Sequence, residues 1–258
     1  MTAKGLKVVI TGASRGIGRA LALEYAARGA TLCLMARSDH LLQQLAASIP
    51  VPSHTYALDV TDAHALAAAA QDFMGRAGCP DIVIANAGVS AGTLTVNSED
   101  NAVFAEVMTV NVVGMMLTFQ PFLEAMKSQR RGVLVGIASI AGFRGLPGAA
   151  AYSASKAAAI SYLESLRVEL RGSGLAVVTI CPGYIATSMT AKNPYRMPFL
   201  MDAASAAAKM TKAIDARKRF YVLPWQMAVL GWGLRRLPRP LFDLLFLHAP
   251  HKPRRASG

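Results

Sequence analysis

Tyr152 and Lys156 have the side chains and the spacing for proton transfer. They fall in an alanine-rich segment, residues 151–171, that predicts a helix, where positions four apart share one face. A free phenol, with a pKa near ~10, holds its proton too tightly to exchange it quickly at neutral pH. A neighbouring ammonium favours the phenolate, so the pair is a candidate general acid and base for a carbonyl or alcohol oxygen. Most Tyr-x-x-x-Lys pairs are solvated surface, and chemistry here therefore requires a cofactor site nearby.

Ser139 is a third candidate for the same chemistry. It follows an apolar run, residues 132–138, that predicts a buried strand, and a Gly/Pro-rich loop then leads to the helix with Tyr152. A hydroxyl at the carboxyl end of this strand could hydrogen-bond the oxygen that Tyr152 protonates.

A glycine-rich turn near the amino terminus predicts a dinucleotide site. The strand-like run 7–11 leads into Gly12-Ala-Ser-Arg-Gly16-Ile-Gly18 and then into a helical pattern over residues 19–28. Gly12 permits a tight turn, Gly16 lets the backbone approach a phosphate, and Gly18 lets the helix pack closely on the strand. The helix N-terminus would face the pyrophosphate with free N–H groups. The predicted cofactor contacts in this turn are Gly12, Ser14, Arg15, Gly16, Ile17 and Gly18.

Arg37 follows the second predicted strand, residues 31–36, where dinucleotide folds place the residue that contacts the adenosine ribose. An acidic residue there would repel a 2′-phosphate, whereas Arg37, with Arg15, suits one. The sequence therefore favours NADP(H) over NAD(H), with solvated surface arginines as the alternative. Asp59 and Val60 end the next strand and are predicted near the adenine, although Asp59 could instead cap the segment from Thr61.

Small and polar residues also follow the later predicted strands. These positions are predicted to contact the cofactor: Asn86, Ala87, Gly88, Pro182, Gly183, Ile185 and Thr187. Asn111 falls in a long helical pattern over residues 99–127 and could equally be a satisfied core residue. Alternating strands and helices predict a single-domain α/β fold, a Rossmann-like doubly wound parallel sheet flanked by helices. Its ligand would bind at the carboxyl ends of the strands.

Composition agrees with one globular domain of 258 residues, with 53% hydrophobic and 16% charged residues. The three cysteines lie in or beside apolar runs and predict reduced core residues, and the histidines lack the spacing of a metal site. No signal peptide is visible, which predicts a cytoplasmic location. Of the 27 Lys and Arg residues, 11 fall in residues 209–258 with only two acidic residues, so the sequence does not favour nucleic-acid binding by the whole domain.

Taken together, these motifs resemble the short-chain dehydrogenase/reductase family over about residues 5–222. The matching positions, in order, are Thr11-Gly12-Ala-Ser-Arg-Gly16-Ile-Gly18, Asn86-Ala87-Gly88, Asn111, Ser139, Tyr152-x-x-x-Lys156, Pro182-Gly183 and Thr187.

The resemblance implies a catalytic tetrad of Asn111, Ser139, Tyr152 and Lys156. Tyr152 would be the acid/base, Ser139 would orient the substrate oxygen, and Lys156 would bind the nicotinamide ribose and lower the pKa of Tyr152. Asn111 would hold a water that links Lys156 to solvent. The resemblance also implies Thr187 at the nicotinamide carboxamide and a homodimer or homotetramer formed through helices about 99–127 and 151–171.

The segment 184–201 is predicted to be a substrate lid and is rich in methionine and aromatic residues. An adaptable, apolar pocket suits a hydrophobic, lipid-like or steroid-like carbonyl substrate better than a sugar. These side chains could instead only pack the lid on the body. The predicted substrate contacts are Ser90, Phe143, Leu146, Tyr184, Met189, Met197 and Phe199.

Residues 220–247 exceed what the fold needs, and residues 223–258 are predicted to be an apolar and basic extension. An uncharged run over residues 220–234 contains two tryptophans and is followed by clustered arginines. This run is short for a bilayer span but suits helices lying in a membrane interface, attracted to anionic lipid through residues 220–255. The extension could equally cover the pocket or pack on a partner subunit.

The leading hypothesis is an NADPH-dependent reductase of a hydrophobic ketone or aldehyde. One alternative is a 3-oxoacyl-carrier-protein reductase whose basic tail docks the acidic carrier. An alternative of another class is a non-catalytic NADPH-binding regulator or membrane-associated scaffold, against which the intact tetrad counts.

Overall fold

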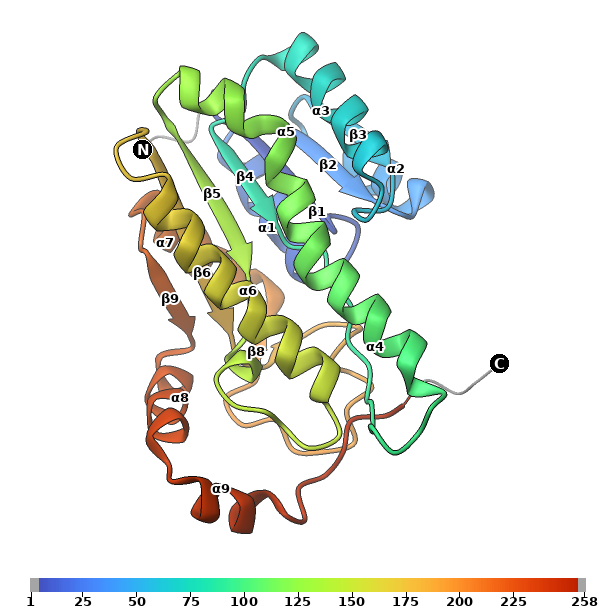
Figure 1. The fold of residues 1–258 in the computed structure, drawn as a ribbon. Helices are drawn as coiled ribbons and strands as arrows, with labels where there is room; N and C mark the ends of the chain where they lie inside the picture. The colour runs from blue at the N-terminus through green and yellow to red at the C-terminus, as the bar shows by residue number, and fades with distance from the viewer. Residues whose placement is uncertain (1–4, 255–258) are drawn as a thin grey trace.

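The computed structural model describes residues 5–254, and this part of the chain folds around one parallel sheet (Figure 1). The strands lie side by side in the order β3-β2-β1-β4-β5-β6-β9. In chain order they are β1 (Lys7–Thr11), β2 (Thr31–Ala36), β3 (Ser53–Ala57), β4 (Ile82–Ala85), β5 (Gly132–Ile137), β6 (Leu175–Pro182) and β9 (Phe220–Leu223). The predicted single-domain α/β sheet is confirmed.

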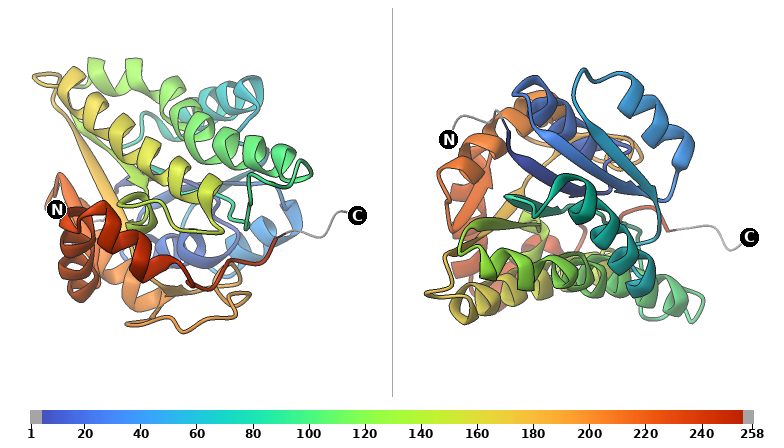
Figure 2. Two further views of the ribbon diagram at one scale, coloured as in Figure 1. Left: turned by 60° about the horizontal axis from the view of Figure 1, so that its bottom comes forward. Right: turned by 90° about the horizontal axis from the view of Figure 1, so that it is seen from above.

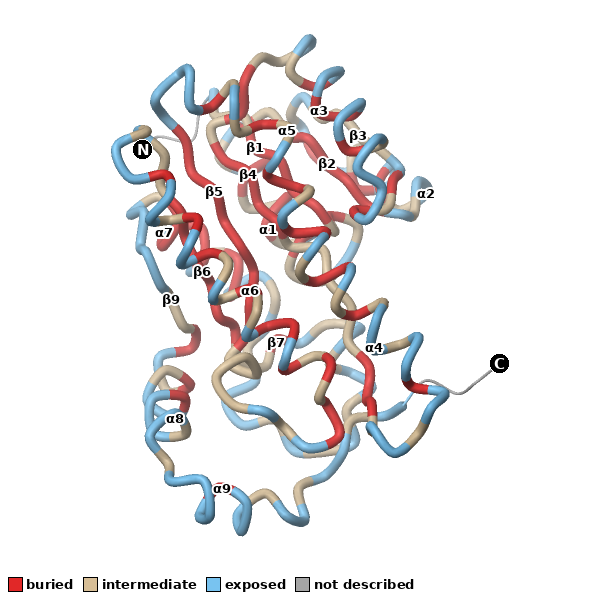
Figure 3. Tube along the Cα trace, viewed as in Figure 1, coloured by how far each residue is buried: buried red, intermediate tan, exposed pale blue. Residues whose placement is uncertain are grey.

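The strand order reverses between β1 and β4. Val9 of β1 lies beside Cys33 of β2 on one side and Val83 of β4 on the other. The chain winds outward from this point in both directions, so the connections after β1 and β4 diverge and leave a crevice at the carboxyl ends of the strands. The central strands carry aliphatic residues on both faces and are buried throughout, as a parallel sheet covered on both sides requires (Figure 3).

Helices cover the two faces of the sheet and form two separate apolar clusters with it (Figure 2). One face carries α1 (Gly16–Ala27), α2 (Asp39–Ala47) and α7 (Ala203–Asp215). The opposite face carries α3 (Ala63–Ala77), α5 (Gly114–Ser128) and α6 (Ala150–Glu169). The three cysteines, Cys33, Cys79 and Cys181, are free and buried.

The predicted long helix is continuous but not uniform. It consists of α4 (Asp100–Met108), a π-helical turn (Thr109–Val113) and α5. By length and composition alone it is apolar enough to cross a membrane. Phe119 and Phe122 are fully buried against the sheet, so we interpret α5 as a core helix. The π turn contains Asn111, and such turns frequently occur at functional sites.

The carboxyl-terminal extension forms two short helices, α8 (Trp225–Arg236) and α9 (Arg239–Phe246), beneath the carboxyl ends of the strands (Figure 1). The prediction that residues 220–247 exceed what the fold requires is wrong for the first four of these residues. Phe220–Leu223 is strand β9, which pairs with Thr179–Pro182 of β6 and completes the sheet. The sequence obscured this because the strand runs directly into the apolar helix that follows it.

Candidate active site

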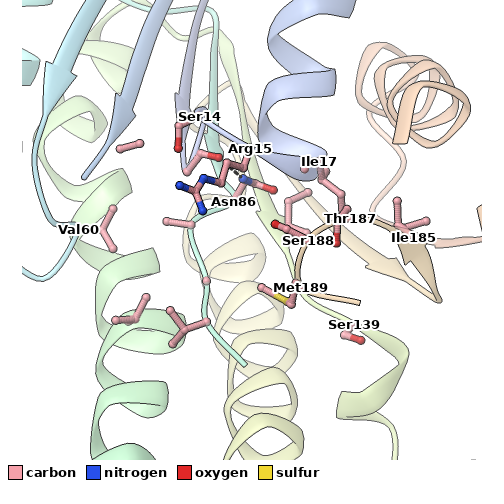
Figure 4. Close-up of a pocket in the computed structure, with 18 of the residues that line it drawn as sticks. Ser14, Arg15, Ile17, Val60, Asn86, Ser139, Ile185, Thr187, Ser188 and Met189 are labelled. Atoms are coloured by element: carbon pink, nitrogen blue, oxygen red, sulfur yellow. Dashed lines mark hydrogen bonds between the residues drawn. The ribbon is translucent and has the colours of Figure 1, made fainter. Parts of the chain in front are cut away.

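A cavity of about 500 Å³ opens at the carboxyl ends of the strands, at the switch point between β1 and β4. In Figure 4, Ser14 and Arg15 lie at one end of this cavity and Ser139 at the other. Every predicted cofactor residue except Gly18 lines it. Residues from six different strand ends therefore meet in one place, as the strand-end argument predicted.

The glycine turn is built for close approach of backbone to backbone. Gly12 has φ +65°, and a Cβ there would lie 2.8 Å from the Cα of Ala87. Gly18 is buried beneath the turn, where a Cβ would lie 2.2 Å from the carbonyl oxygen of Gly12. The Asn86 amide donates to the carbonyl oxygens of Thr11, at 3.0 Å, and Gly12, at 3.2 Å, and so ties the ends of β1 and β4 together.

Helix α1 begins at this turn with its first N–H groups directed at the cavity. Its N-cap residue, Arg15, has no side-chain capping bond to the helix. Uncapped N–H groups and the positive end of the helix dipole form an anion site. Gly16, with φ +53°, keeps the approach clear of side chains, and the turn therefore fits a dinucleotide pyrophosphate.

Arg37 extends from the end of β2 into the rim of the cavity. Its side chain is 67% exposed, and its nearest carboxylate, Asp59, lies 3.9 Å away. Asp59 accepts hydrogen bonds from the backbone N–H of Thr61, at 2.9 Å, and from its hydroxyl, at 2.8 Å. The cap of helix α3 is Asp62 rather than Asp59. Arg37 is therefore loosely paired and free to turn toward a ligand.

Ser139, Tyr152 and Lys156 all line the cavity. Burial raises the pKa of Tyr152, and a hydrogen bond with Ser139 opposes that rise. Lys156 donates to the carbonyl oxygen of Ile137 at 2.9 Å, and its ammonium lies 5.8 Å from the centre of the Tyr152 ring. Burial lowers the pKa of Lys156 to about 8.

In the protein without its cofactor, desolvation is the largest influence on the pKa of Tyr152, and the Lys156 ammonium donates to the Ile137 carbonyl. The Tyr152 phenol therefore keeps its proton at neutral pH. The expectation that Lys156, together with a bound nicotinamide, lowers the pKa of Tyr152 stays a prediction.

Asn111 does not line the cavity and is fully buried. Its side-chain oxygen accepts from the N–H of Val89 at 2.8 Å, and its amide nitrogen donates to the Val89 carbonyl at 3.0 Å. The same nitrogen donates to the Ser155 hydroxyl at 2.9 Å. These bonds fix the loop after β4 beside Lys156. The water-holding role that the resemblance implied stays a prediction.

The predicted substrate residues are scattered. Of these seven, Met189 alone lines the cavity. Phe143 packs against α8, where a Cβ on Gly231 would lie 2.5 Å from its ring. Tyr184 and Met197 lie within the lid, whose ends are joined by the short strands β7 (Ile185–Ala186) and β8 (Met201–Asp202). The remaining residues outside the cavity lining are Ser90, Leu146 and Phe199.

Sequence reasoning missed several residues that line the cavity. Most are neighbours of predicted positions, and they are Ala36, Ser38, Leu58, Val89, Val110, Ile137, Ala138, Ser188 and Thr190. Counting one residue to either side of each strand-end motif would have found the majority. Lys252, whose ammonium lies 4.7 Å from the centre of the Tyr152 ring, had no such signal because it comes from the far end of the chain.

A glycine turn at a helix N-terminus, a buried serine and lysine and a half-buried tyrosine meet at one switch-point crevice, and together they define an oxidoreductase site for a nicotinamide dinucleotide. The family model described as short chain dehydrogenase matches residues 6–197. The chain belongs to this family, whose members use NAD or NADP, and the family prediction is confirmed.

Known proteins of the family resemble most of the chain. An uncharacterized oxidoreductase of Myxococcus xanthus (strain DK1622) is 42% identical over 238 residues, which cover 91% of this chain and 94% of the relative. The dehydrogenase/reductase SDR family member 7B of Bos taurus is 35% identical, with 97% of this chain and 83% of the relative covered. The crystal structure of levodione reductase superposes with a TM-score of 0.76 at 26% identity, covering 85% of this chain and 95% of that chain.

Proposed function

We propose that this protein is an NADPH-dependent reductase that converts a hydrophobic ketone or aldehyde to the alcohol, reversibly. The observation that carries the proposal is that Ser139, Tyr152 and Lys156 line one strand-end cavity together with the glycine turn, and that Tyr152 is hydrogen-bonded to Ser139. A phenol beside a serine hydroxyl and an ammonium can donate a proton to a carbonyl oxygen, which carbonyl reduction requires.

Three residues of the chain have separate roles in the proposed reduction. Ser139 orients the carbonyl oxygen, and Tyr152 donates its proton to that oxygen as negative charge develops on it. Lys156 holds a buried positive charge near both groups. A bound nicotinamide would supply the hydride. The glycine turn and the N-terminus of α1 would hold its pyrophosphate.

The preference for NADPH rests on Arg37 and Arg15 at the rim of the cavity. Guanidinium groups make bidentate, charge-assisted hydrogen bonds to a phosphate. Arg37 has only a distant carboxylate partner, at 3.9 Å, and can exchange it for a 2′-phosphate at little cost.

A spectrophotometric screen tests the reaction. NADPH consumption is followed with a panel of lipophilic ketones and aldehydes, and a short acyl thioester tests the carrier-protein alternative. Tyr152→Phe keeps the ring and removes the proton donor, so turnover should fall at least ~100-fold while NADPH still binds. Tyr162→Phe, on the same helix, is the matched control. No NADPH oxidation with any carbonyl would favour the non-catalytic alternative.

The extension supports a proposal of peripheral attachment to the cytoplasmic face of an anionic membrane. Large apolar side chains on α8 and α9 are exposed, with Trp225 at 70%, Trp232 at 60% and Leu244 at 69%. Arg235, Arg236 and Arg239 lie among them. Exposed aromatic and aliphatic groups with adjacent arginines are typical of helices that lie in a membrane interface.

A homodimer or homotetramer formed through α4, α5 and α6 is a further proposal. Apolar side chains are exposed along these helices, including Phe104, Val113, Met116 and Val168, which is 60% exposed. Light scattering on the purified protein measures the assembly, and Val168→Glu should shift it toward smaller species. Retention of the wild-type mass by this variant would exclude α6 from the interface.

A further inference from the structure

The last described residues of the chain return to the active site. After α9, the segment 249–254, here called the strap, runs back to the loop that follows β4 (Figure 2) and passes beside Tyr152, which lines the cavity. The N–H of Gly92 donates to the carbonyl oxygen of Pro253 at 2.9 Å, and Gly92 and Arg254 form a parallel bridge. The strap therefore makes backbone pairing with the body of the protein.

An ion pair between exposed Arg254 and buried Asp100 anchors the strap. The Nε atom of Arg254 donates to the two carboxylate oxygens of Asp100, at 3.2 and 3.0 Å, and Asp100 is only 5% exposed. Asp100 also accepts from the N–H of Leu94 at 2.7 Å. A carboxylate is rarely buried unless it is paired. The pairing of Arg254 with Asp100 is therefore a specific attachment of the strap to the body of the protein.

Two glycines leave room for the path of the strap. A Cβ on Gly92 would lie 2.1 Å from the carbonyl oxygen of Lys252. A Cβ on Gly148, which has φ +67°, would lie 2.6 Å from the side chain of His251. The strap lies so close to Gly92 and Gly148 that neither position has room for a side chain, and its position is therefore defined.

This position places Lys252 at the catalytic tyrosine. Its ammonium donates to the hydroxyl of Ser90 and lies 4.7 Å from the centre of the Tyr152 ring. Within residues 5–254, no carboxylate forms an ion pair with it. Burial lowers the pKa of Lys252 to about 8. The cation is therefore partly desolvated and lacks an ion-pair partner where it lies, beside Tyr152 and just outside the residues that line the cavity.

We propose that Lys252 determines substrate specificity by binding a carboxylate of the substrate, so that the preferred substrates are oxo acids. This inference rests on the proposed carbonyl reduction and makes its substrate class more specific. The oxo group would lie at Tyr152 and Ser139, and the carboxylate would pair with Lys252 and Ser90. An ammonium that has already lost much of its hydration pays little further desolvation on binding an anion. The apolar lid would then contact the carbon chain.

The test compares matched ligands on the full-length protein. Hexanoate and hexanamide have similar size and differ in charge, and neither has a carbonyl that the enzyme would reduce. In the presence of NADP⁺, calorimetry should show hexanoate binding at least ~10-fold more tightly than hexanamide, the worth of one charge-assisted hydrogen bond. Lys252→Met should remove this difference, and Lys252→Arg should retain most of it. Lys218→Met, which changes a lysine that contacts Tyr221, is the matched control.

The kinetic arm uses an oxo acid and its methyl ester. The ratio of their kcat/KM values should favour the acid at least ~10-fold in the wild type and approach one in Lys252→Met. A ratio unchanged by Lys252→Met, or a wild type without preference, overturns the inference and leaves carbonyl reduction standing. Tight hexanoate binding through Lys252, without turnover of any carbonyl, instead overturns the proposed reaction. Circular dichroism spectra that match the wild type show that each variant is folded.

Discussion

The two ends of one cavity are built in different ways. The cofactor end is made of strand ends and the turns that follow them, so that Gly12, Asn86 and Pro182 occupy positions fixed by the sheet. The end near Tyr152 is made of segments distant in sequence, namely the loop after β4 and the lid 184–201, with the strap 249–254 lying beside Tyr152. A rigid sheet carries the part of the reaction common to the family, and the loops carry the part specific to this chain.

This difference predicts that substitutions at the cofactor end weaken cofactor binding and activity, whereas substitutions at the end near Tyr152 change the substrate preference. The largest effect is expected for Gly18→Ala. Its Cβ would lie 2.2 Å from the Gly12 carbonyl and 2.5 Å from the Asn86 amide, so the turn must shift. Overpacking costs about 1–3 kcal/mol, which corresponds to a fall in NADPH affinity of about 5- to 150-fold.

Gly75→Ala is the matched control for this variant. Gly75 lies in the last turn of α3, and nothing lies within 4 Å of a Cβ added there. This change should raise the free energy of unfolding by about 0.5–1 kcal/mol and leave NADPH binding unchanged. Thermal unfolding and fluorescence titration with NADPH measure both effects. Wild-type affinity in Gly18→Ala would show that the turn is not fixed by the sheet.

The next largest effect is expected at the rim of the cofactor end. Arg37→Gln keeps a polar side chain and removes the charge that we assign to the 2′-phosphate. The ratio of kcat/KM with NADPH to that with NADH should fall by about 10-fold, because one charge-assisted hydrogen bond is lost. Arg76→Gln, which changes an exposed arginine on α3, should leave the ratio unchanged. An unchanged ratio in Arg37→Gln would exclude this residue from cofactor discrimination.

The same division explains what the sequence could predict. The strands, the order of their motifs and the cofactor end follow from local signals, because each functional residue stands one or two positions beyond an apolar run. Phe143 was expected in the pocket, yet it packs on α8, because only the tertiary structure reveals that Gly231 makes room for its ring. Lys252 could not be placed at all, since an ion pair between Arg254 and Asp100 determines where the strap lies.

The sign of the Tyr152 pKa shift also lay beyond the sequence. The four-residue spacing of Tyr152 and Lys156 predicted neighbouring side chains but not the depth of their burial. The hydrogen bond from Lys156 to Ile137 is a long-range contact with strand β5, and helix periodicity carries no information about it. Burial is the largest influence on the pKa of each of these two residues, and the spacing of the residues does not reveal it.

A smaller effect, on vesicle binding rather than on catalysis, is expected for substitutions in the carboxyl-terminal extension, outside the cavity. Replacing Trp232 and Leu245, which are 60% and 64% exposed, by Gln should weaken binding to phosphatidylglycerol-containing vesicles by about 10-fold. Val96→Gln, at an 87% exposed site, is the control. Point substitutions are preferable to a truncation near Tyr221, which would cut strand β9 and remove the strap. Equal co-sedimentation of wild type and variant would exclude α8 and α9 as the membrane surface.

The smallest expected effect is a change of rate with pH. It reports on the catalytic pair when Lys252→Met is measured with an uncharged ketone, because Lys252 lies beside Tyr152 and its pKa is also lowered to about 8. Reduction requires protonated Tyr152, whose raised pKa keeps it protonated at and above neutral pH. It also requires cationic Lys156, and a pKa lowered to about 8 means that this charge is lost as pH rises through that value. The kcat/KM for reduction should therefore be flat from about pH 6 to 7.5 and fall a few-fold by about pH 8.5. A profile that stays flat to pH 9 would show that Lys156 keeps its charge in the working enzyme. The measurement therefore tests the charge of Lys156 and not that of Tyr152.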